Sequence, residues 1–187
     1  MNATFHEAAI LMVPGLRDHV EDHWQTHFAE THANVRTVPP LQRDKLDRAA
    51  RVAALDAELA QIEGPVVLVA HSAGVMITAH WALRQRRKIR GALLVTPPDF
   101  DAPLPEGYPT LDELRLHGWL PTPRERLPFP CVVAASRNDP LARFERVADM
   151  ARDWGARLHD LGEVGHMNPA SGFGEWREAE RLIAAID

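Results

Sequence analysis

Short apolar runs alternate along the chain with segments in which apolar residues recur every three or four positions. A short apolar run is typical of a buried strand, and the longer period is typical of a helix packed on one face. We predict strands over 8–13, 35–38, 65–70, 89–95, 131–135 and 157–161, and helices over 19–30, 44–62, 73–87, 141–154 and 174–186. This alternation predicts a three-layer α/β/α protein whose mainly parallel sheet of about six strands has helices on both faces.

One stretch, 96–130, interrupts the alternation. It holds a large share of the prolines and only a short helical pattern, over 110–117. A connection of this length inside a compact domain is usually functional or forms a small lid. Ligands of parallel α/β sheets bind at the carboxyl ends of the strands, so we expect this excursion to cross that edge without forming a large cap.

The composition is that of a globular protein and excludes several classes. With 187 residues, 45% of them apolar, we expect one domain over 1–187 with a sizeable core. One cysteine excludes a disulfide framework and a cysteine-rich zinc site. A net charge of −5 argues against nucleic acid as a partner, and no apolar run approaches the ~20 residues that cross a bilayer. The start, 1–7, lacks a basic segment and the apolar run after it is too short for a signal peptide, so we expect a cytoplasmic protein.

The segment Val69-Ala70-His71-Ser72-Ala73-Gly74 leads from a predicted strand straight into a predicted helix. Such a tight turn strains the backbone of its central residue and needs small residues two positions to either side, here Ala70 and Gly74. The turn would lift the Ser72 hydroxyl above the sheet, where the first helical N–H groups can stabilise a developing oxyanion. Ala70 stands where the usual pattern has glycine. The alternative is that Ser72 only caps the helix.

Two later loops could supply the base and the acid that a serine nucleophile needs. In sheets of this kind the order along the chain is serine, carboxylate, histidine. Asp139 follows the predicted strand 131–135 and His166 follows the next one, so both lie beyond strand ends on the same edge as Ser72. Alone, Asp139 could be a turn residue or helix cap, and His166 an ordinary loop histidine. Their joint placement favours a Ser72–Asp139–His166 triad.

The loop after the first strand is the expected source of a second oxyanion donor. We choose the backbone N–H of Leu16, alongside that of Ala73 at the start of the helix. Gly15 would let the backbone approach a substrate closely. A plain turn that ends the strand is the alternative.

Side chains on the excursion are candidates for substrate binding. Asp99 follows the strand beside the nucleophile's strand and could touch substrate, although a turn carboxylate is more usual. Trp119, together with Phe100 and Tyr108, would either form an apolar acyl pocket or simply anchor the excursion.

Taken together, the motifs resemble those of a known family. The chain carries Pro14-Gly15-Leu16, His23-Trp24-Gln25, Ala70-His71-Ser72-Ala73-Gly74, Ser136-Arg137-Asn138-Asp139-Pro140 and a C-terminal run from Gly165-His166-Met167-Asn168 to Trp176. These are similar to motifs of the small serine hydrolases of the bacterial YdeN and human retinoblastoma-binding type, and the resemblance covers essentially the whole chain. It implies a compact α/β-hydrolase fold without a large cap, and a Ser72–Asp139–His166 triad. It also implies that substrates are poorly defined and that some members are known chiefly as partners of other proteins.

Other residues with chemical potential are predicted to be structural. His19, His23 and His27 are spaced by four, so they would share one helix face, a spacing that can hold a divalent metal. No metalloprotease motif accompanies them, so we predict a solvated polar face, with no metal and no cofactor. Cys131 begins an apolar strand and is predicted to be a small core residue. His71 could line the turn or be a buried histidine whose hydrogen bonds are satisfied, and we favour the second.

These residues predict acyl transfer. His166 would take the Ser72 proton as the serine oxygen attacks an ester carbonyl, and Asp139 would orient the imidazole. We expect a serine hydrolase that cleaves small carboxylic esters or thioesters through an acyl-enzyme, with an ester-like small molecule as its substrate and neither nucleic acid nor membrane as a partner. The alternatives are a protein-binding module with weak or vestigial activity, and an amidase or peptidase-type hydrolase.

Overall fold

A parallel sheet forms the centre of the protein. The computed structural model describes residues 8–18, 20–84 and 87–186. Its strands are β1 (Ala9–Val13), β2 (Val35–Thr37), β3 (Val66–His71), β4 (Gly91–Val95), β5 (Cys131–Ala135) and β6 (Arg157–Asp160), and they lie in the order β2-β1-β3-β4-β5-β6. All neighbouring pairs are parallel. The carboxyl ends of the six strands therefore lie along one edge.

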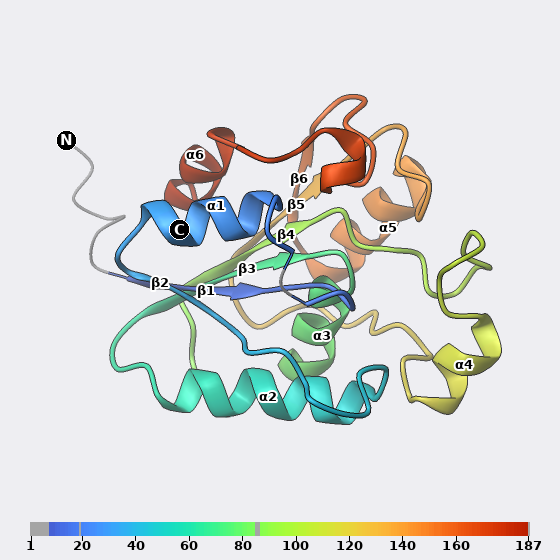
Figure 1. The fold of residues 1–187 in the computed structure, drawn as a ribbon, viewed down its shortest axis with the longest axis horizontal. Helices are drawn as coiled ribbons and strands as arrows, with labels where there is room; N and C mark the ends of the chain where they lie inside the picture. Colours follow the sequence, from blue (N-terminus) through green and yellow to red (C-terminus); the bar gives the residue numbers. More distant parts are fainter. Residues whose placement is uncertain (1–7, 19, 85–86, 187) are drawn as a thin grey trace.

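Helices cover both faces of this sheet (Figure 1). They are α1 (Trp24–Thr31), α2 (Arg48–Ala60), α3 (Ala73–Ala82), α4 (Leu111–Leu116), α5 (Phe144–Trp154) and α6 (Glu178–Ala184). The apolar residues of α1 and α6 pack on one face, and those of α2, α3 and α5 pack on the other. The short α4 lies within the excursion 96–130, beyond the ends of the strands (Figure 1). The predicted three-layer arrangement without a large cap is confirmed.

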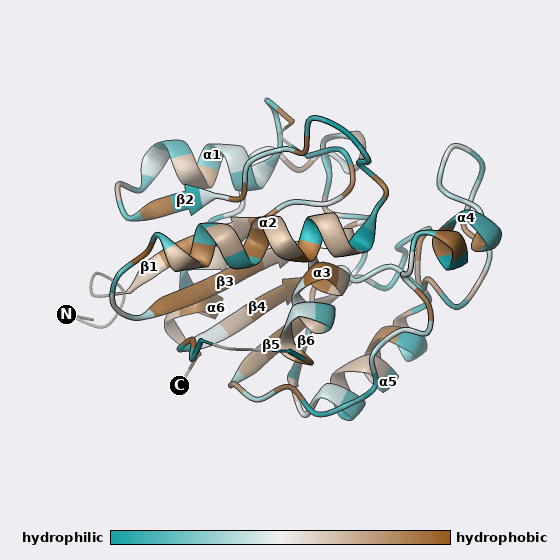
Figure 2. Cartoon of the chain, turned by 90° about the horizontal axis from the view of Figure 1, so that it is seen from below, coloured by the Kyte–Doolittle hydropathy of each residue, from teal (hydrophilic) through white to brown (hydrophobic). Residues whose placement is uncertain are grey.

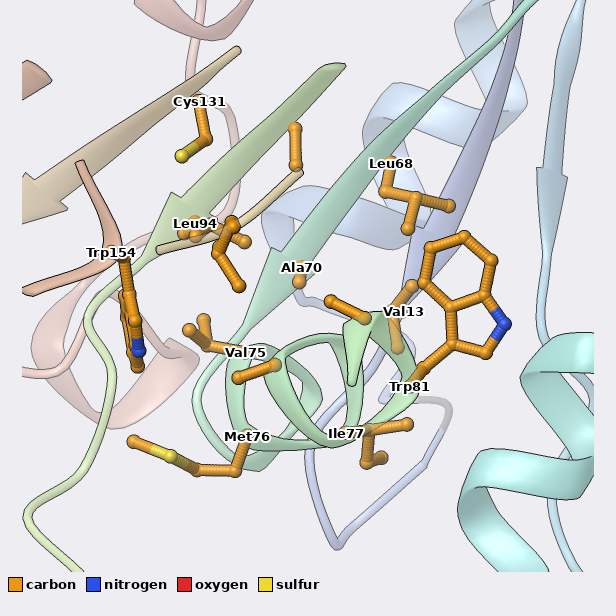
Figure 3. Packing of buried hydrophobic residues seen from close by; sticks show 14 of the residues in the cluster. Val13, Leu68, Ala70, Val75, Met76, Ile77, Trp81, Leu94, Cys131 and Trp154 are labelled. Atoms are coloured by element: carbon orange, nitrogen blue, oxygen red, sulfur yellow. The ribbon is translucent and has the colours of Figure 1, made fainter. Parts of the chain in front are cut away.

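Two apolar cores form because successive side chains of a strand point to opposite faces. On β3, Leu68 and Ala70 belong to the core under α3, whereas Val67 and Val69 belong to the core under α1 and α6. Figure 3 shows Ala70 on the side of β3 that α3 covers. All 10 residues of α3 are buried, so this helix is covered by protein on every side. In Figure 2, β3 is hydrophobic along its length, whereas α2 mixes hydrophilic and hydrophobic residues.

The predicted strands are confirmed to within about two residues, and the helix starts differ more. Helix α1 begins at Trp24 rather than at residue 19, because His23 takes an extended conformation and its side chain accepts the Gln25 N–H. Helix α2 begins after Asp47, whose carboxylate accepts the N–H of Ala50. Helix α3 ends at Ala82, short of the predicted 87, and 85–86 lie outside the described residues.

Residues 1–7, on which the expectation about a signal peptide partly rested, lie outside the described part of the chain. Among the residues that the structure describes, no helix is long and apolar enough to span a bilayer. The cytoplasmic location stays a prediction.

Candidate active site

Ser72 stands in a strained turn between β3 and α3. Its backbone has φ 55° and ψ −128°, in a region that side-chain-bearing residues rarely adopt. The turn is tight because α3 lies directly against β1: a Cβ at Gly74 would overlap the carbonyl oxygen of Val13. The Ser72 side chain makes no capping hydrogen bond to α3. The interpretation of Ser72 as a mere helix cap is therefore wrong, and its hydroxyl is free for another partner.

That partner is the imidazole of His166. Its Nε2 lies 2.8 Å from the Ser72 Oγ, and its Nδ1 lies 2.9 Å from Oδ2 and 3.0 Å from Oδ1 of Asp139. A carboxylate can only accept here, so Nδ1 carries the imidazole proton and Nε2 can accept the serine proton. The side chains of His166 and Asp139 are 5% and 1% exposed. The structure thus brings the three predicted residues together in one buried chain of hydrogen bonds.

Asn138 and Ser136 fasten the loop that carries Asp139 to the loop that carries His166. The Asn138 Oδ1 accepts the Gly165 N–H over 2.7 Å, and the Ser136 Oγ accepts the Val164 N–H over 3.3 Å. The Ser136 hydroxyl also donates to the Asn138 Oδ1 over 3.0 Å. The polar residues before Asp139 therefore position the next loop along the sheet edge.

The backbone of His166 is held at both its N–H and its carbonyl. The N–H donates to the Ser171 Oγ over 3.1 Å, and that hydroxyl donates to the Asn168 Oδ1 over 2.9 Å. On the other side, the His71 Nε2 lies 2.8 Å from the His166 carbonyl oxygen. Because a carbonyl only accepts, this nitrogen of His71 carries a proton. The prediction that His71 is buried and hydrogen-bonded is confirmed.

Aromatic and imidazole rings pack behind the loop that carries His166. The His23 ring contacts the His71 ring edge-on at 4.5 Å between centroids, and the Trp24 ring meets that of Trp176 at 4.9 Å. Burial is the main reason that the pKa of His71 falls well below its ordinary value of 6.5 and that of His23 falls to about 4. Both rings are therefore neutral near pH 7 and place no positive charge beside the imidazole of His166.

The loop after β1 lies against Ser72. A Cβ at Gly15 would stand 3.2 Å from the Ser72 Cβ, so glycine allows this approach. Leu16 and Ala73 both line the cavity above Ser72. Ala73 is the first residue of α3, whose N–H has no partner within the helix, and the Leu16 N–H has no acceptor among the described residues. Both predicted donors thus belong to residues that line the cavity, and their role as oxyanion donors stays a prediction.

Arg51 of α2 anchors this loop from behind, a role that the sequence analysis missed. Its guanidinium donates to the Leu16 carbonyl over 3.1 Å and pairs with the Asp18 carboxylate. Arg51 is only 5% exposed and lies one and two helical turns before the buried Leu55 and Leu59. The sequence feature that could have revealed this role is an arginine in line with the apolar residues of the helix.

A cavity of about 390 Å³ opens above Ser72, between the loop after β1, the excursion and the loop of His166. Much of its wall is apolar, with contributions from Leu16, Leu46, Phe100, Leu104, Tyr108 and Leu141. The excursion therefore supplies one wall of the cavity, as expected from its place in the chain. Phe100 and Tyr108 are the two aromatic residues that it contributes.

A family model described as serine hydrolase matches residues 10–185. The chain belongs to the serine hydrolase family. Among solved structures, a YdeN-like protein from Pectobacterium atrosepticum is 29% identical, with a TM-score of 0.82 over 97% of this chain and 91% of that one. The ydeN gene product of Bacillus subtilis is 17% identical, with a TM-score of 0.70 over 95% and 97%. An α/β-superfamily protein from Xanthomonas campestris is 21% identical, with a TM-score of 0.60 over 95% and 96%. The last two show the fold alone, and no protein with a curated description matches.

Two predicted substrate contacts of this serine hydrolase are wrong. Asp99 does not line the cavity; its carboxylate pairs with the Arg146 Nε at 3.2 Å and accepts the Asp101 N–H at 3.2 Å. Trp119 is fully buried, and its indole N–H donates to the Leu46 carbonyl over 2.7 Å. Its ring packs edge-on against Phe100, 5.3 Å between centroids. Trp119 therefore anchors the excursion and supports Phe100, which does face the cavity.

The predicted histidine face is not formed, and Cys131 is a core residue. His23 precedes α1 and turns toward His71, His27 lies inside α1, and His19 lies outside the described residues. Within the described residues, no group of three histidine, cysteine or acidic side chains could hold a metal ion. Burial raises the pKa of the Cys131 thiol to about 11, so it stays protonated near neutral pH.

Proposed function

We propose that this serine hydrolase cleaves small carboxylic esters or thioesters through an acyl-enzyme on Ser72. The observation that carries the proposal is the position of His166, within hydrogen-bond reach of both the Ser72 hydroxyl and the Asp139 carboxylate. A serine hydroxyl is a weak nucleophile, and an adjacent oriented base is what activates it.

In the proposed reaction, the Ser72 Oγ attacks the ester carbonyl while its proton moves to the His166 Nε2. Asp139 stabilises the resulting imidazolium and keeps it in the required orientation. The N–H groups of Leu16 and Ala73 donate to the oxyanion of the tetrahedral intermediate. The intermediate collapses, the His166 proton passes to the leaving alcohol or thiol, and the acyl group stays on Ser72. Water then attacks the acyl-enzyme, gives a proton to His166, and the acid is released as that proton returns to Ser72.

The walls of the cavity support a short, largely apolar acyl group. A volume of about 390 Å³ is near the lower end of the roughly 300–1,000 Å³ of small-molecule sites. The excursion narrows the cavity with Phe100, Leu104 and Tyr108. We therefore expect activity to peak at short to medium acyl chains and to fall for long ones.

A fluorophosphonate probe tests the proposal, because it reacts only with an activated serine. We expect the wild-type protein to be labelled and the Ser72→Ala variant to stay unlabelled. A series of 4-nitrophenyl esters and acyl thioesters of increasing chain length then measures the substrate class. If a folded wild-type protein is not labelled and cleaves neither esters nor thioesters, the proposal is overturned and the protein-binding alternative is favoured. Cleavage of matched anilides but not of esters would instead favour the amidase alternative.

A further inference from the structure

The charged residues at the mouth of the cavity are predominantly basic. Arg17, Asp18 and Lys45 are the charged residues among those that line it, apart from the histidines. The Asp18 carboxylate is already compensated: it pairs with the buried Arg51 and lies 3.4 Å from the Lys45 Nζ. Arg17 and Lys45 line the mouth, and the one carboxylate among the lining residues is paired with the buried Arg51 behind the loop, although the whole chain carries a net charge of −5. The mouth is a local cationic site on an acidic protein.

Among the residues that the structure describes, Arg17 is the member of this group that has no carboxylate partner. Its guanidinium lies over the Tyr108 ring, 5.9 Å from the centroid, and it forms no ion pair with any residue that the structure describes. By contrast, Arg124 within the excursion pairs with Asp153, and Arg146 of α5 pairs with Asp99 of the excursion. Stacking on an aromatic ring orients a guanidinium but leaves its N–H donors free to bind an anion.

Arg17 lies next in the chain to the residue that is proposed to bind the reacting carbonyl. It follows Leu16, whose N–H is the proposed oxyanion donor, so a carbonyl bound at that donor lies one residue away from Arg17. The contact with Tyr108 also keeps the arginine side chain between the loop after β1 and the excursion. A short acyl chain could therefore lie along the apolar wall and end at the guanidinium.

We propose that Arg17 makes this hydrolase selective for esters whose acyl chain ends in a carboxylate, that is, half-esters of short dicarboxylic acids. The inference rests on the proposed ester hydrolysis at Ser72 and adds the chemical class of the acyl group. The apolar wall receives the methylene groups, and the Arg17 guanidinium binds the terminal carboxylate through charge-assisted hydrogen bonds. Lys45 adds to the positive potential at the mouth and attracts the anionic substrate.

Matched ester pairs test this selectivity. The mono-4-nitrophenyl esters of succinic, glutaric and adipic acid are compared with the 4-nitrophenyl esters of butanoic, pentanoic and hexanoic acid, which have the same chain lengths. The quantity measured is the ratio of kcat/KM for the charged ester to kcat/KM for its neutral partner. We expect a ratio above one for at least one chain length in the wild-type protein. Raising the salt concentration should lower it, since an exposed ionic contact is screened.

Variants separate a local contact from a general effect of charge. Arg17→Gln should lower the ratio about tenfold, mainly through the KM of the charged ester, and Arg17→Lys should restore only part of it because it lacks the planar fork. The matched control is Arg152→Gln, which removes the same charge from an exposed arginine on α5 and should leave the ratio unchanged.

Two results would overturn the inference: a wild-type ratio at or below one for every chain length, or the same ratio in Arg17→Gln as in the wild type. Fluorophosphonate labelling of Ser72 would in either case still support the proposed hydrolase. If labelling and ester cleavage both fail, the proposed function falls and this inference falls with it.

Discussion

His71 and His166 are joined side chain to backbone: the Nε2–H of His71 donates to the carbonyl oxygen of His166 over 2.8 Å. His71, which directly precedes the proposed nucleophile Ser72, thus holds the loop that carries the proposed base, His166. The centroids of the two imidazole rings lie 5.0 Å apart. A neutral imidazole can do this without adding a positive charge beside the imidazolium that forms on His166. The strained turn therefore fixes the serine and its base together.

Replacing His71 by alanine should lower kcat while leaving KM nearly unchanged. The loop would lose its hydrogen bond to the His166 carbonyl, and a misplacement of about 1 Å can cost roughly 100-fold in rate. Steady-state kinetics and the rate of fluorophosphonate labelling measure the effect. The matched control is His80→Ala, because the His80 Nε2 makes a similar contact, 3.1 Å from the Trp119 carbonyl. Equal losses of kcat in the two variants would show that His71 acts only through stability.

Replacing Asp139 by asparagine should remove most of the activity without unfolding the protein. The amide has nearly the shape of the carboxylate, and its oxygen can still accept the Leu141 N–H, which is 2.8 Å from Oδ1. It no longer favours the tautomer in which Nδ1 of His166 carries the proton, and in a related triad this change costs about 10⁴ in kcat. Asp160→Asn, at an exposed carboxylate paired with Arg137, is the control. A loss of less than tenfold in Asp139→Asn would contradict the assigned role.

The alternation of apolar runs and helical periods was sufficient to predict the layers of this fold. Strands buried on both faces read as continuous apolar runs, and β5 was predicted with its observed ends, Cys131–Ala135. The residues of the candidate site were equally accessible, because loops after successive parallel strands must meet at one edge. Ser72, Asp139 and His166 could therefore be grouped before any distance was known.

The sequence could not reveal contacts between polar groups far apart in the chain. The Asp99 carboxylate binds Arg146, which lies 47 residues later in the chain, instead of lining the cavity. No local sequence pattern predicts this ion pair. Likewise, the loop of Leu16 depends on Arg51, 35 residues later. The start of α1 was misplaced because an imidazole served as the cap, whereas serine, threonine, aspartate and asparagine are the usual signals.

A methyl group at Gly74 should destabilise the protein and disturb the turn of Ser72. The added Cβ would overlap the Val13 carbonyl oxygen, and backbone atoms cannot move aside as a flexible side chain can. Forcing extra atoms into such a contact typically costs about 1–3 kcal/mol. Chemical denaturation of Gly74→Ala measures the loss. Gly174→Ala is the control, since its Cβ would meet the nearest atom at 3.6 Å, an ordinary contact, and unchanged stability of Gly74→Ala would contradict the tight approach of α3 to β1.

The buried histidines predict that the protein loses stability as the pH falls from 6.5 toward 4. Burial is the main cause that lowers the pKa of His23 and of His80 to about 4, from an ordinary value of 6.5. Between these two values the unfolded chain binds protons that the folded chain does not, so acidification favours unfolding, by at most about 1.4 kcal/mol per pH unit for each such histidine. Above pH 6.5 both states hold these rings neutral, and the dependence disappears.

Denaturant titrations of the wild type and of His80→Gln at pH 7.5 and at pH 5 isolate one of these contributions. His80 is chosen because it lies outside the candidate site, and glutamine can still donate a hydrogen bond to the Trp119 carbonyl. The variant should lose less stability than the wild type between the two pH values, since it has one fewer group to protonate on unfolding. Equal losses would mean that His80 already binds its proton in the folded protein, because only a difference in bound protons between the two states can make stability depend on pH.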